Sequence, residues 1–180
     1  MTRLILINGA PGSGKSTLAR MLVDEQPLAL LMDIDTLRGQ LGQWSDDPVA
    51  AGMAARRLAL AMIHTHLVAG HDVVVPQFLF RLPFILELER VASESDGRFV
   101  EIALVSSPQE AAARFTARSD SNDPNHQDAV RLQQAPGAQP IEELYAVMLN
   151  MLRERPATLF VDSVPGDISG TFNALQQIIP

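Results

Sequence analysis

The chain has 180 residues, of which 47% are hydrophobic and 19% charged, a composition typical of one folded globular domain rather than a disordered chain. Fourteen basic and 21 acidic residues give a net charge of −7, which argues against a general nucleic-acid-binding surface. Cysteine is absent, so disulfides and thiolate metal sites are excluded, and no apolar run reaches the roughly 18–20 residues of a membrane helix. We therefore expect a single domain over residues 1–180, a cytoplasmic location and no membrane partner.

The first predicted elements are a short buried strand at residues 3–8 and a helix at residues 16–25, joined by a glycine-rich loop. Every fixed position of the phosphate-loop pattern G-x-x-x-x-G-K-[ST] is matched by Gly9, Ala10, Pro11, Gly12, Ser13, Gly14, Lys15 and Ser16. Strand, loop and helix in this order are the structural context that the pattern requires. The motif predicts binding of a nucleoside triphosphate.

Lys15 is the only lysine among the 14 basic residues, the others being arginines. A tight site can distinguish the compact charge of lysine from the wide guanidinium fork. The backbone N–H groups of such a loop surround an anion, and the helix N-terminus adds partial positive charge. We expect Lys15 to reach the β- and γ-phosphates, Ser16 to ligate Mg²⁺, and Thr17 to complete the binding segment.

The remaining elements alternate strand and helix, which predicts an α/β fold with a mostly parallel sheet. We expect, in chain order, a strand at 28–32, a helix at 48–70, a strand at 73–75 that Pro76 stops, a helix at 82–95, a strand at 99–105, a helix at 107–118, a helix at 141–154, a strand at 158–161 and a helix at 167–178. The polar segment 119–140 separates two of these helices. A segment of this length is typical of a functional lid or a disordered insertion.

Other classes of phosphate-loop protein fit the sequence less well than a small kinase does. A GTPase needs a guanine-reading Asn-Lys-x-Asp, and the chain has no second lysine. An ATP-driven motor normally has an acidic pair closing a strand, whereas the third strand here is followed by Pro76 and Gln77. A small kinase needs only ATP, Mg²⁺, a base for the acceptor hydroxyl and groups that stabilise charge.

Two carboxylates, Asp33 and Asp35, follow the second predicted strand. In a doubly wound sheet, ligands bind beyond the carboxyl ends of the strands, so this pair is expected near the phosphate loop. One acid could orient Mg²⁺ through its waters while the other accepts a hydroxyl proton. The alternative is an Asp that caps a helix beside a solvated neighbour.

The loop, Asp33-x-Asp35 with Arg38, and Arg114-x-x-x-Arg118 together resemble small phosphate-loop kinases of the nucleoside-monophosphate-kinase fold. The nearest are chloramphenicol phosphotransferase and the zeta-toxin-like, AAA-type kinases, with gluconate and shikimate kinases as relatives. The resemblance implies a five-stranded parallel sheet in the order 2-3-1-4-5 with a lid insertion. It also implies transfer of the γ-phosphate of ATP to a hydroxyl of a small molecule with the help of Mg²⁺, with Asp35 as catalytic base and Asp33 nearer the metal.

Arginines of the predicted lid are candidates for contacts with the phosphates. Arg114 and Arg118 lie at i and i+4 on one helix face, and closure would bring both to ATP, with Arg118 assisting transfer. Arg131 is a weaker candidate of the same type. The alternative for these side chains is an ordinary solvated helix face.

Candidate substrate contacts are Arg38, Gln77 and Arg81. Residues 76–81 are mostly apolar and lack the Gly-Gly-Gly of shikimate kinases and the Asp-Gly-x-Pro-Arg of nucleoside-monophosphate kinases, which argues against sugar-acid and nucleotide acceptors. Two further functions remain open, a kinase of an RNA end or a nucleotide-sugar, and a nucleotide-binding regulatory ATPase that acts through a protein partner. The acceptor itself is not predicted.

Overall fold

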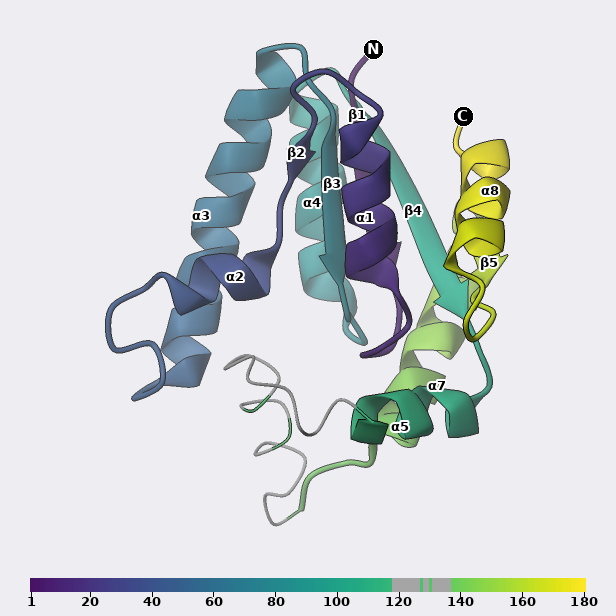
Figure 1. The fold of residues 1–180 in the computed structure, drawn as a ribbon. Helices are drawn as coiled ribbons and strands as arrows, with labels where there is room; N and C mark the ends of the chain where they lie inside the picture. Colours follow the sequence, from purple (N-terminus) through teal and green to yellow (C-terminus); the bar gives the residue numbers. More distant parts are fainter. Residues whose placement is uncertain (118–126, 128–129, 131–136) are drawn as a thin grey trace.

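A five-stranded parallel sheet forms the centre of the structure, a computed structural model that describes residues 1–117, 127, 130 and 137–180 (Figure 1). The strand order β2-β3-β1-β4-β5 confirms the expected topology, and every pair of neighbouring strands is parallel. The strands are β1 (Arg3–Asn8), β2 (Leu30–Leu31), β3 (Val73–Gln77), β4 (Arg98–Val105) and β5 (Leu159–Asp162).

Helices cover both faces of this sheet, which explains why its strands are almost continuously apolar. Leu4 and Leu6 of β1 pack on the side of α3 (Pro48–Val68), α4 (Leu82–Glu94) and α7 (Ile141–Arg153). Ile5 and Ile7 pack on the opposite side, against α1 (Lys15–Asp24) and α8 (Ile168–Ile178). Within the described residues, no helix has both the length and the apolar character needed to cross a bilayer.

Two short helices, α2 (Ile34–Gly39) and α5 (Pro108–Ala117), follow β2 and β4 at the carboxyl end of the sheet (Figure 1). The phosphate-loop segment lies at this same end, and both chain termini lie at the other. Most of the predicted lid 119–140 lies outside the described residues. The connections at the carboxyl end are therefore the parts of the fold that build the candidate site.

The second strand is shorter than the predicted 28–32. Leu28 has a φ of +59°, in the left-handed region, so the extended conformation cannot begin there. Pairing continues by one hydrogen bond beyond β2, from the Met32 N–H to the Val74 carbonyl at 2.9 Å. The chain then turns into α2 at Asp33.

The third strand continues through Pro76 to Gln77, so the prediction that Pro76 stops it was wrong. Along a strand, the N–H and C=O groups of alternate residues face the same neighbouring strand. The Val74 carbonyl bonds Met32 on the β2 side, so residue 76 also faces that side. Because β2 ends at Leu31, the N–H that proline lacks affects only the end of the pairing with β2 and leaves the pairing of β3 with β1 intact, so Pro76 is tolerated.

Candidate active site

Residues 9–14 connect β1 to α1 and form a loop whose conformation requires glycine at two positions. Gly14 has a φ of +88°, and a Cβ placed on it would lie 3.0 Å from Cδ1 of Ile168. A Cβ on Gly9 would lie 2.8 Å from the Ser13 hydroxyl oxygen and 3.1 Å from Cβ of Leu104. These close approaches by neighbouring side chains leave no room for a Cβ at either glycine. A glycine-rich loop of this kind can turn successive N–H groups toward an anion.

Lys15 and Ser16 lie in the first turn of α1. The ammonium of Lys15 donates to the carbonyl of Ala10, 3.2 Å away, so its side chain folds back across the loop. The first turn carries no acidic residue, and Gly14 supplies no capping side chain, so no side-chain cap competes with an anion at the N-terminus of α1.

Asp33 is the N-cap of α2. Its Oδ1 accepts hydrogen bonds from the backbone N–H groups of Asp35 at 3.0 Å and Thr36 at 3.1 Å. The capping role weighed for this residue is therefore present in the structure. Capping uses one carboxylate oxygen, and no hydrogen bond to the other is found among the described residues.

Asp35 lies in the first turn of α2 and is exposed at the surface, although protein atoms around its carboxylate displace part of the surrounding water. This loss of hydration raises the pKa of the Asp35 carboxyl above its ordinary value. The charge of Arg38 opposes the rise in pKa, and the charge of Asp33 adds to it. Lys15 and a hydrogen bond from Gln77 also lower the pKa of Asp35. The carboxylate thus lies close enough to the phosphate-loop lysine to be influenced by its charge.

The segment after β3 lies beside the phosphate loop because Asn8 holds it there. Asn8 is the last residue of β1 and is fully buried; its amide donates to the Leu79 carbonyl and accepts from the Leu79 N–H, both at 2.9 Å. Gln77 is paired with Asn8 in the sheet. Sequence reasoning missed Asn8, because nothing near it in the chain indicates a partner 71 residues away.

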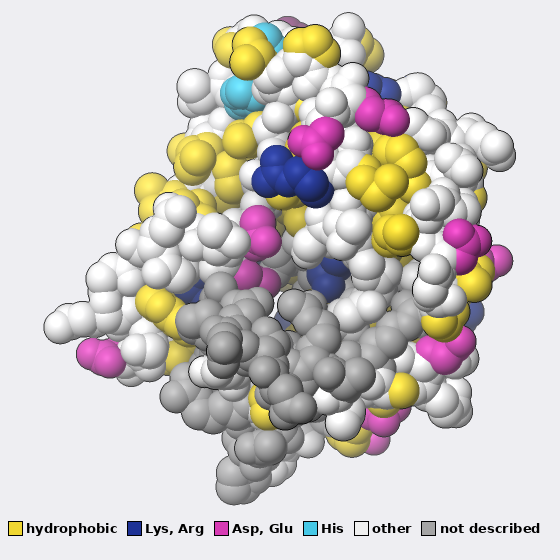
Figure 2. Space-filling model, viewed as in Figure 1, with side chains coloured by type: hydrophobic (Ala, Val, Ile, Leu, Met, Phe, Trp, Pro, Cys, Tyr) yellow, Lys and Arg dark blue, Asp and Glu magenta, His cyan; other side chains and the backbone are white. Residues whose placement is uncertain are grey.

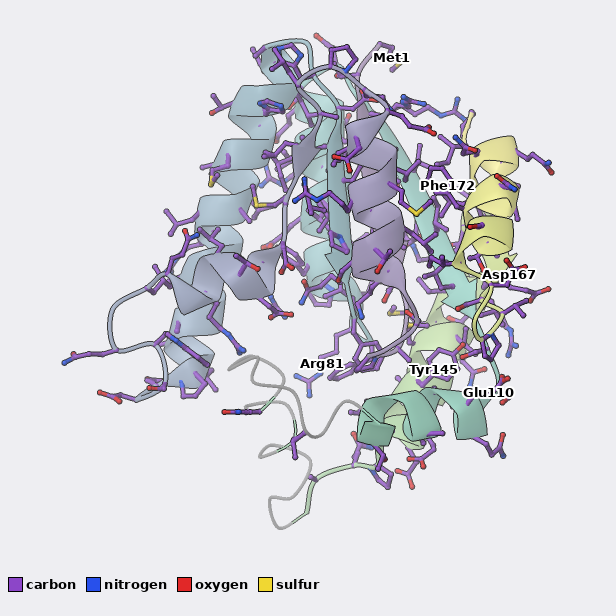
Figure 3. All side chains as sticks on the ribbon, viewed as in Figure 1. Met1, Arg81, Glu110, Tyr145, Asp167 and Phe172 are labelled. Carbon is purple, nitrogen blue, oxygen red and sulfur yellow. The ribbon has the colours of Figure 1, made fainter. Side chains whose placement is uncertain are left out.

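The predicted substrate contacts Arg38 and Arg81 each lie over an aromatic ring. The guanidinium carbon of Arg38 is 4.8 Å from the centre of the Trp44 ring, and that of Arg81 is 5.6 Å from the centre of the Phe80 ring. Figure 3 shows Arg81 extending beyond the end of β3, toward the side where α5 lies. In Figure 2, acidic and basic side chains face each other across a hollow on the visible face.

On the other side of the loop lies a cavity of about 420 Å³. Its walls are formed by two segments far apart in the sequence, namely Gly12, Ser13 and Gly14, and Ser163, Val164, Pro165, Gly166, Ile168 and Thr171. The Ser163 hydroxyl donates to the Ser13 carbonyl at 2.9 Å and joins the two segments. A serine at position 163 does not by itself predict this contact, so sequence reasoning missed it.

The predicted lid arginines are not placed by the structure. The backbone of Arg114 lies in α5, but its side chain is outside the described part, as are Arg118 and Arg131. The start of α5 is well anchored, because the hydroxyl of the buried Tyr145 on α7 accepts from the Ser106 N–H at 2.8 Å. The arginine contacts with phosphate remain predictions.

Comparison with known families assigns the chain by sequence. The family model described as an AAA domain (AAA_33) matches residues 4–140, which is most of the chain. No curated protein is significantly similar to it in sequence.

Solved structures share the fold at low sequence identity. A proposed kinase from Chloroflexus aurantiacus J-10-fl matches over 99% of both chains with 19% identity and a TM-score of 0.66. A gluconokinase from Sinorhizobium meliloti 1021 matches over 96% of this chain and 93% of its own, with 18% identity and a TM-score of 0.55. A chain of the Pnkp1/Rnl/Hen1 RNA repair complex gives a TM-score of 0.69 at 16% identity, over 87% of this chain but 47% of its own. The chain therefore has the fold of phosphate-loop kinases.

Proposed function

We propose that this chain, which belongs to the AAA domain family, is an ATP-dependent phosphotransferase that moves the γ-phosphate of ATP to a hydroxyl of a small molecule. One observation carries the proposal. A carboxylate whose pKa is raised, Asp35, lies within the electrostatic reach of Lys15, the lysine of the phosphate loop. A group that would bind phosphate and a group that would accept a proton thus lie within electrostatic reach of each other.

The nucleotide would bind across the loop at residues 9–17. Its phosphates would meet the N–H groups at the start of α1 and the Lys15 ammonium, and its base would enter the cavity of about 420 Å³ beside the loop. Val164, Pro165 and Ile168 give that cavity apolar surface suited to a purine ring.

The donors near the loop fit Mg²⁺, which prefers oxygen ligands and keeps several waters. Ser16 would offer its hydroxyl, and Asp33 the carboxylate oxygen that α2 does not use, directly or through water. Bound there, the ion would neutralise charge on the β- and γ-phosphates.

In the transfer step, a bond forms between the acceptor oxygen and the γ-phosphorus while the bond to the β,γ-bridging oxygen breaks. Asp35 accepts the proton of the acceptor hydroxyl, and Lys15 stabilises the charge on the transferring group. Arg114 and Arg118 would add to this stabilisation from the lid. The acceptor would lie between Asp35 and the segment after β3, within reach of Arg38, Gln77 and Arg81.

The test is a transfer assay with γ-labelled ATP and a panel of hydroxylated metabolites, antibiotics, nucleotide-sugars and RNA 5′ ends. With the acceptor found, Asp35→Asn should reduce transfer about 10²- to 10⁴-fold and leave ATP affinity nearly unchanged, because an amide can hold the hydroxyl but cannot take its proton. Asp33→Asn is the matched variant, since asparagine also caps helices, and should instead raise the Mg²⁺ concentration needed for activity.

Exchanged phenotypes would reverse the two roles. Equal activity of both variants and the wild type would leave Asp33 a helix cap alone and remove Asp35 as the base. ATP hydrolysis that no acceptor stimulates, but that a partner protein does, would favour the regulatory ATPase instead.

A further inference from the structure

Ser163 is the residue after β5, and it joins that strand end to the phosphate loop. It is only 7% exposed, and its N–H donates to the Val105 carbonyl of β4 at 2.7 Å. Its hydroxyl donates to the Ser13 carbonyl, 150 residues away in the chain, at 2.9 Å. The backbone bond fixes Ser163 to the rigid sheet, so the hydroxyl is a fixed donor aimed at the loop.

The carbonyl that Ser163 holds belongs to the peptide unit between Ser13 and Gly14. In a trans peptide the C=O and N–H groups point in opposite directions, and the described residues contain no cis peptide. A hydroxyl that holds the Ser13 carbonyl therefore turns the Gly14 N–H away from Ser163. The orientation of one N–H group of the phosphate loop is thus set from outside the loop.

Backbone hydrogen bonds hold the two neighbouring peptide units, from the Ser13 N–H to the Ala10 carbonyl at 3.1 Å and from the Leu18 N–H to the Gly14 carbonyl at 2.9 Å. Among the described residues, no backbone hydrogen bond to the Ser13 carbonyl itself is found. The torsions that rotate this peptide are the ψ of Ser13 and the φ of Gly14, and Gly14, with a φ of +88°, lacks the Cβ that would restrict the second of them. The hydroxyl of Ser13 is buried and has no hydrogen-bond partner among the described residues, so it does not provide the restraint. Among the described residues, the side chain that hydrogen-bonds the Ser13 carbonyl is that of Ser163.

We propose that Ser163 is a positioning residue of the nucleotide site, which holds the Ser13–Gly14 peptide with its N–H turned to bind the nucleotide phosphates. The proposal rests on the proposed function, because it takes ATP as the ligand of the loop. Prior orientation matters energetically, since a peptide that is free to rotate loses that freedom when phosphate binds. Ser163 also lines the cavity for the base, so the same residue fixes the phosphate site relative to the base site.

Ser163→Ala removes the hydroxyl and keeps the backbone bond to Val105. We expect the affinity for ATP and for inorganic tripolyphosphate, measured by isothermal titration calorimetry, to fall by about 2- to 10-fold, the range for one lost hydrogen bond. The affinity for adenosine, measured by NMR titration, should stay the same because adenosine has no phosphate to meet the Gly14 N–H.

Ser95→Ala is the matched control. Ser95 is 8% exposed, and at the end of α4, away from the loop, its hydroxyl donates to the Val91 carbonyl at 2.7 Å and lies 2.9 Å from Nδ1 of His64. Its replacement should lower the melting temperature at least as much as Ser163→Ala does and leave the ratio of ATP to adenosine affinity unchanged. Should Ser163→Ala fail to fold, Ser163→Cys keeps nearly the same volume with a much weaker donor and should show the same loss of phosphate affinity.

An unchanged ratio of ATP to adenosine affinity in both Ser163 variants would overturn the proposal. That result is distinct from a failure of the proposed function, which would show as a wild-type protein that does not bind ATP at all. Equal loss of ATP and adenosine affinity would also contradict the proposal, because it would mean a general disturbance of the cavity.

Discussion

Asp35 combines three features that bear on its protonation. It lies at the carboxyl end of a parallel sheet, its carboxylate is crowded by protein atoms, and it is near both Lys15 and Arg38. The two cations lower its pKa, yet crowding outweighs them, so the net shift is upward. Groups with such opposed influences are frequent in catalytic sites, because a base must be ionised and still ready to take a proton.

The raised pKa of Asp35 predicts a pH-dependent cost in stability. Below the ordinary aspartate pKa of about 3.9, both the folded and the unfolded chain hold the proton, and Asp35 makes no difference. As the pH rises, the unfolded chain releases the proton first, so ionisation favours unfolding until the pH exceeds the folded-state pKa. Asp35→Asn should therefore be more stable than the wild type at pH 7, and the gap should close toward pH 3.5.

Urea unfolding of both proteins at several pH values between 3.5 and 7 measures this gap. Asp46→Asn, an exposed acid in the loop before α3, is the control and should show no such pH-dependent gain. A wild type that is the more stable protein at pH 7 would mean that the folded state favours ionised Asp35, against the direction of the shift.

Among the elements, β1 and the segment after β3 form one unit through Asn8. The strand ends beside the phosphate loop, and in the proposed function the segment after β3 would contact the acceptor. The two bonds from Asn8 to Leu79 would then fix the acceptor site relative to the phosphate site. This bidentate contact satisfies both backbone groups of Leu79. It also gives the buried amide nitrogen and oxygen of Asn8 a hydrogen-bond partner each, as buried polar atoms require.

Asn8→Asp should lower the free energy of unfolding by about 1–3 kcal/mol. The new carboxylate can still accept from the Leu79 N–H, but it faces the Leu79 carbonyl with an acceptor in place of a donor. Amide hydrogen exchange should become faster at Leu79 and Phe80. Asn150→Asp on the exposed face of α7 is the control and should change stability by less than about 0.5 kcal/mol. Unchanged exchange in Asn8→Asp would show that other contacts hold the segment.

At the scale of the whole molecule, what the sequence predicts correctly is local or periodic. The phosphate loop is contiguous, and the alternation of apolar strands with helices is enough to indicate the α/β class. The topology followed from the resemblance to kinases, and the structure confirms it. Contacts between distant segments, such as those of Asn8 and Ser163, leave no mark in the local pattern, because either side chain would suit many environments.

The errors at β2 and Pro76 have the same origin. The apolar run at 28–32 favours a strand, but the edge position of β2 lets the chain leave the sheet early. Proline usually ends a strand, but Pro76 lies within β3 and faces the side on which pairing with β2 has ended. Both outcomes depend on which strand lies next to which, and a residue pattern alone does not contain that information.

The central claim is that the loop at residues 9–16 binds the phosphates of ATP through Lys15. Isothermal titration calorimetry of Mg²⁺ and ATP with the wild type and with Lys15→Ala tests it without any knowledge of the acceptor. We predict that the wild type binds ATP and that Lys15→Ala weakens binding about 10- to 100-fold with an unchanged melting temperature, because a charge-assisted contact to phosphate is lost and no core contact is removed. Equal ATP affinity of the two proteins, or no binding by the folded wild type, would contradict the account.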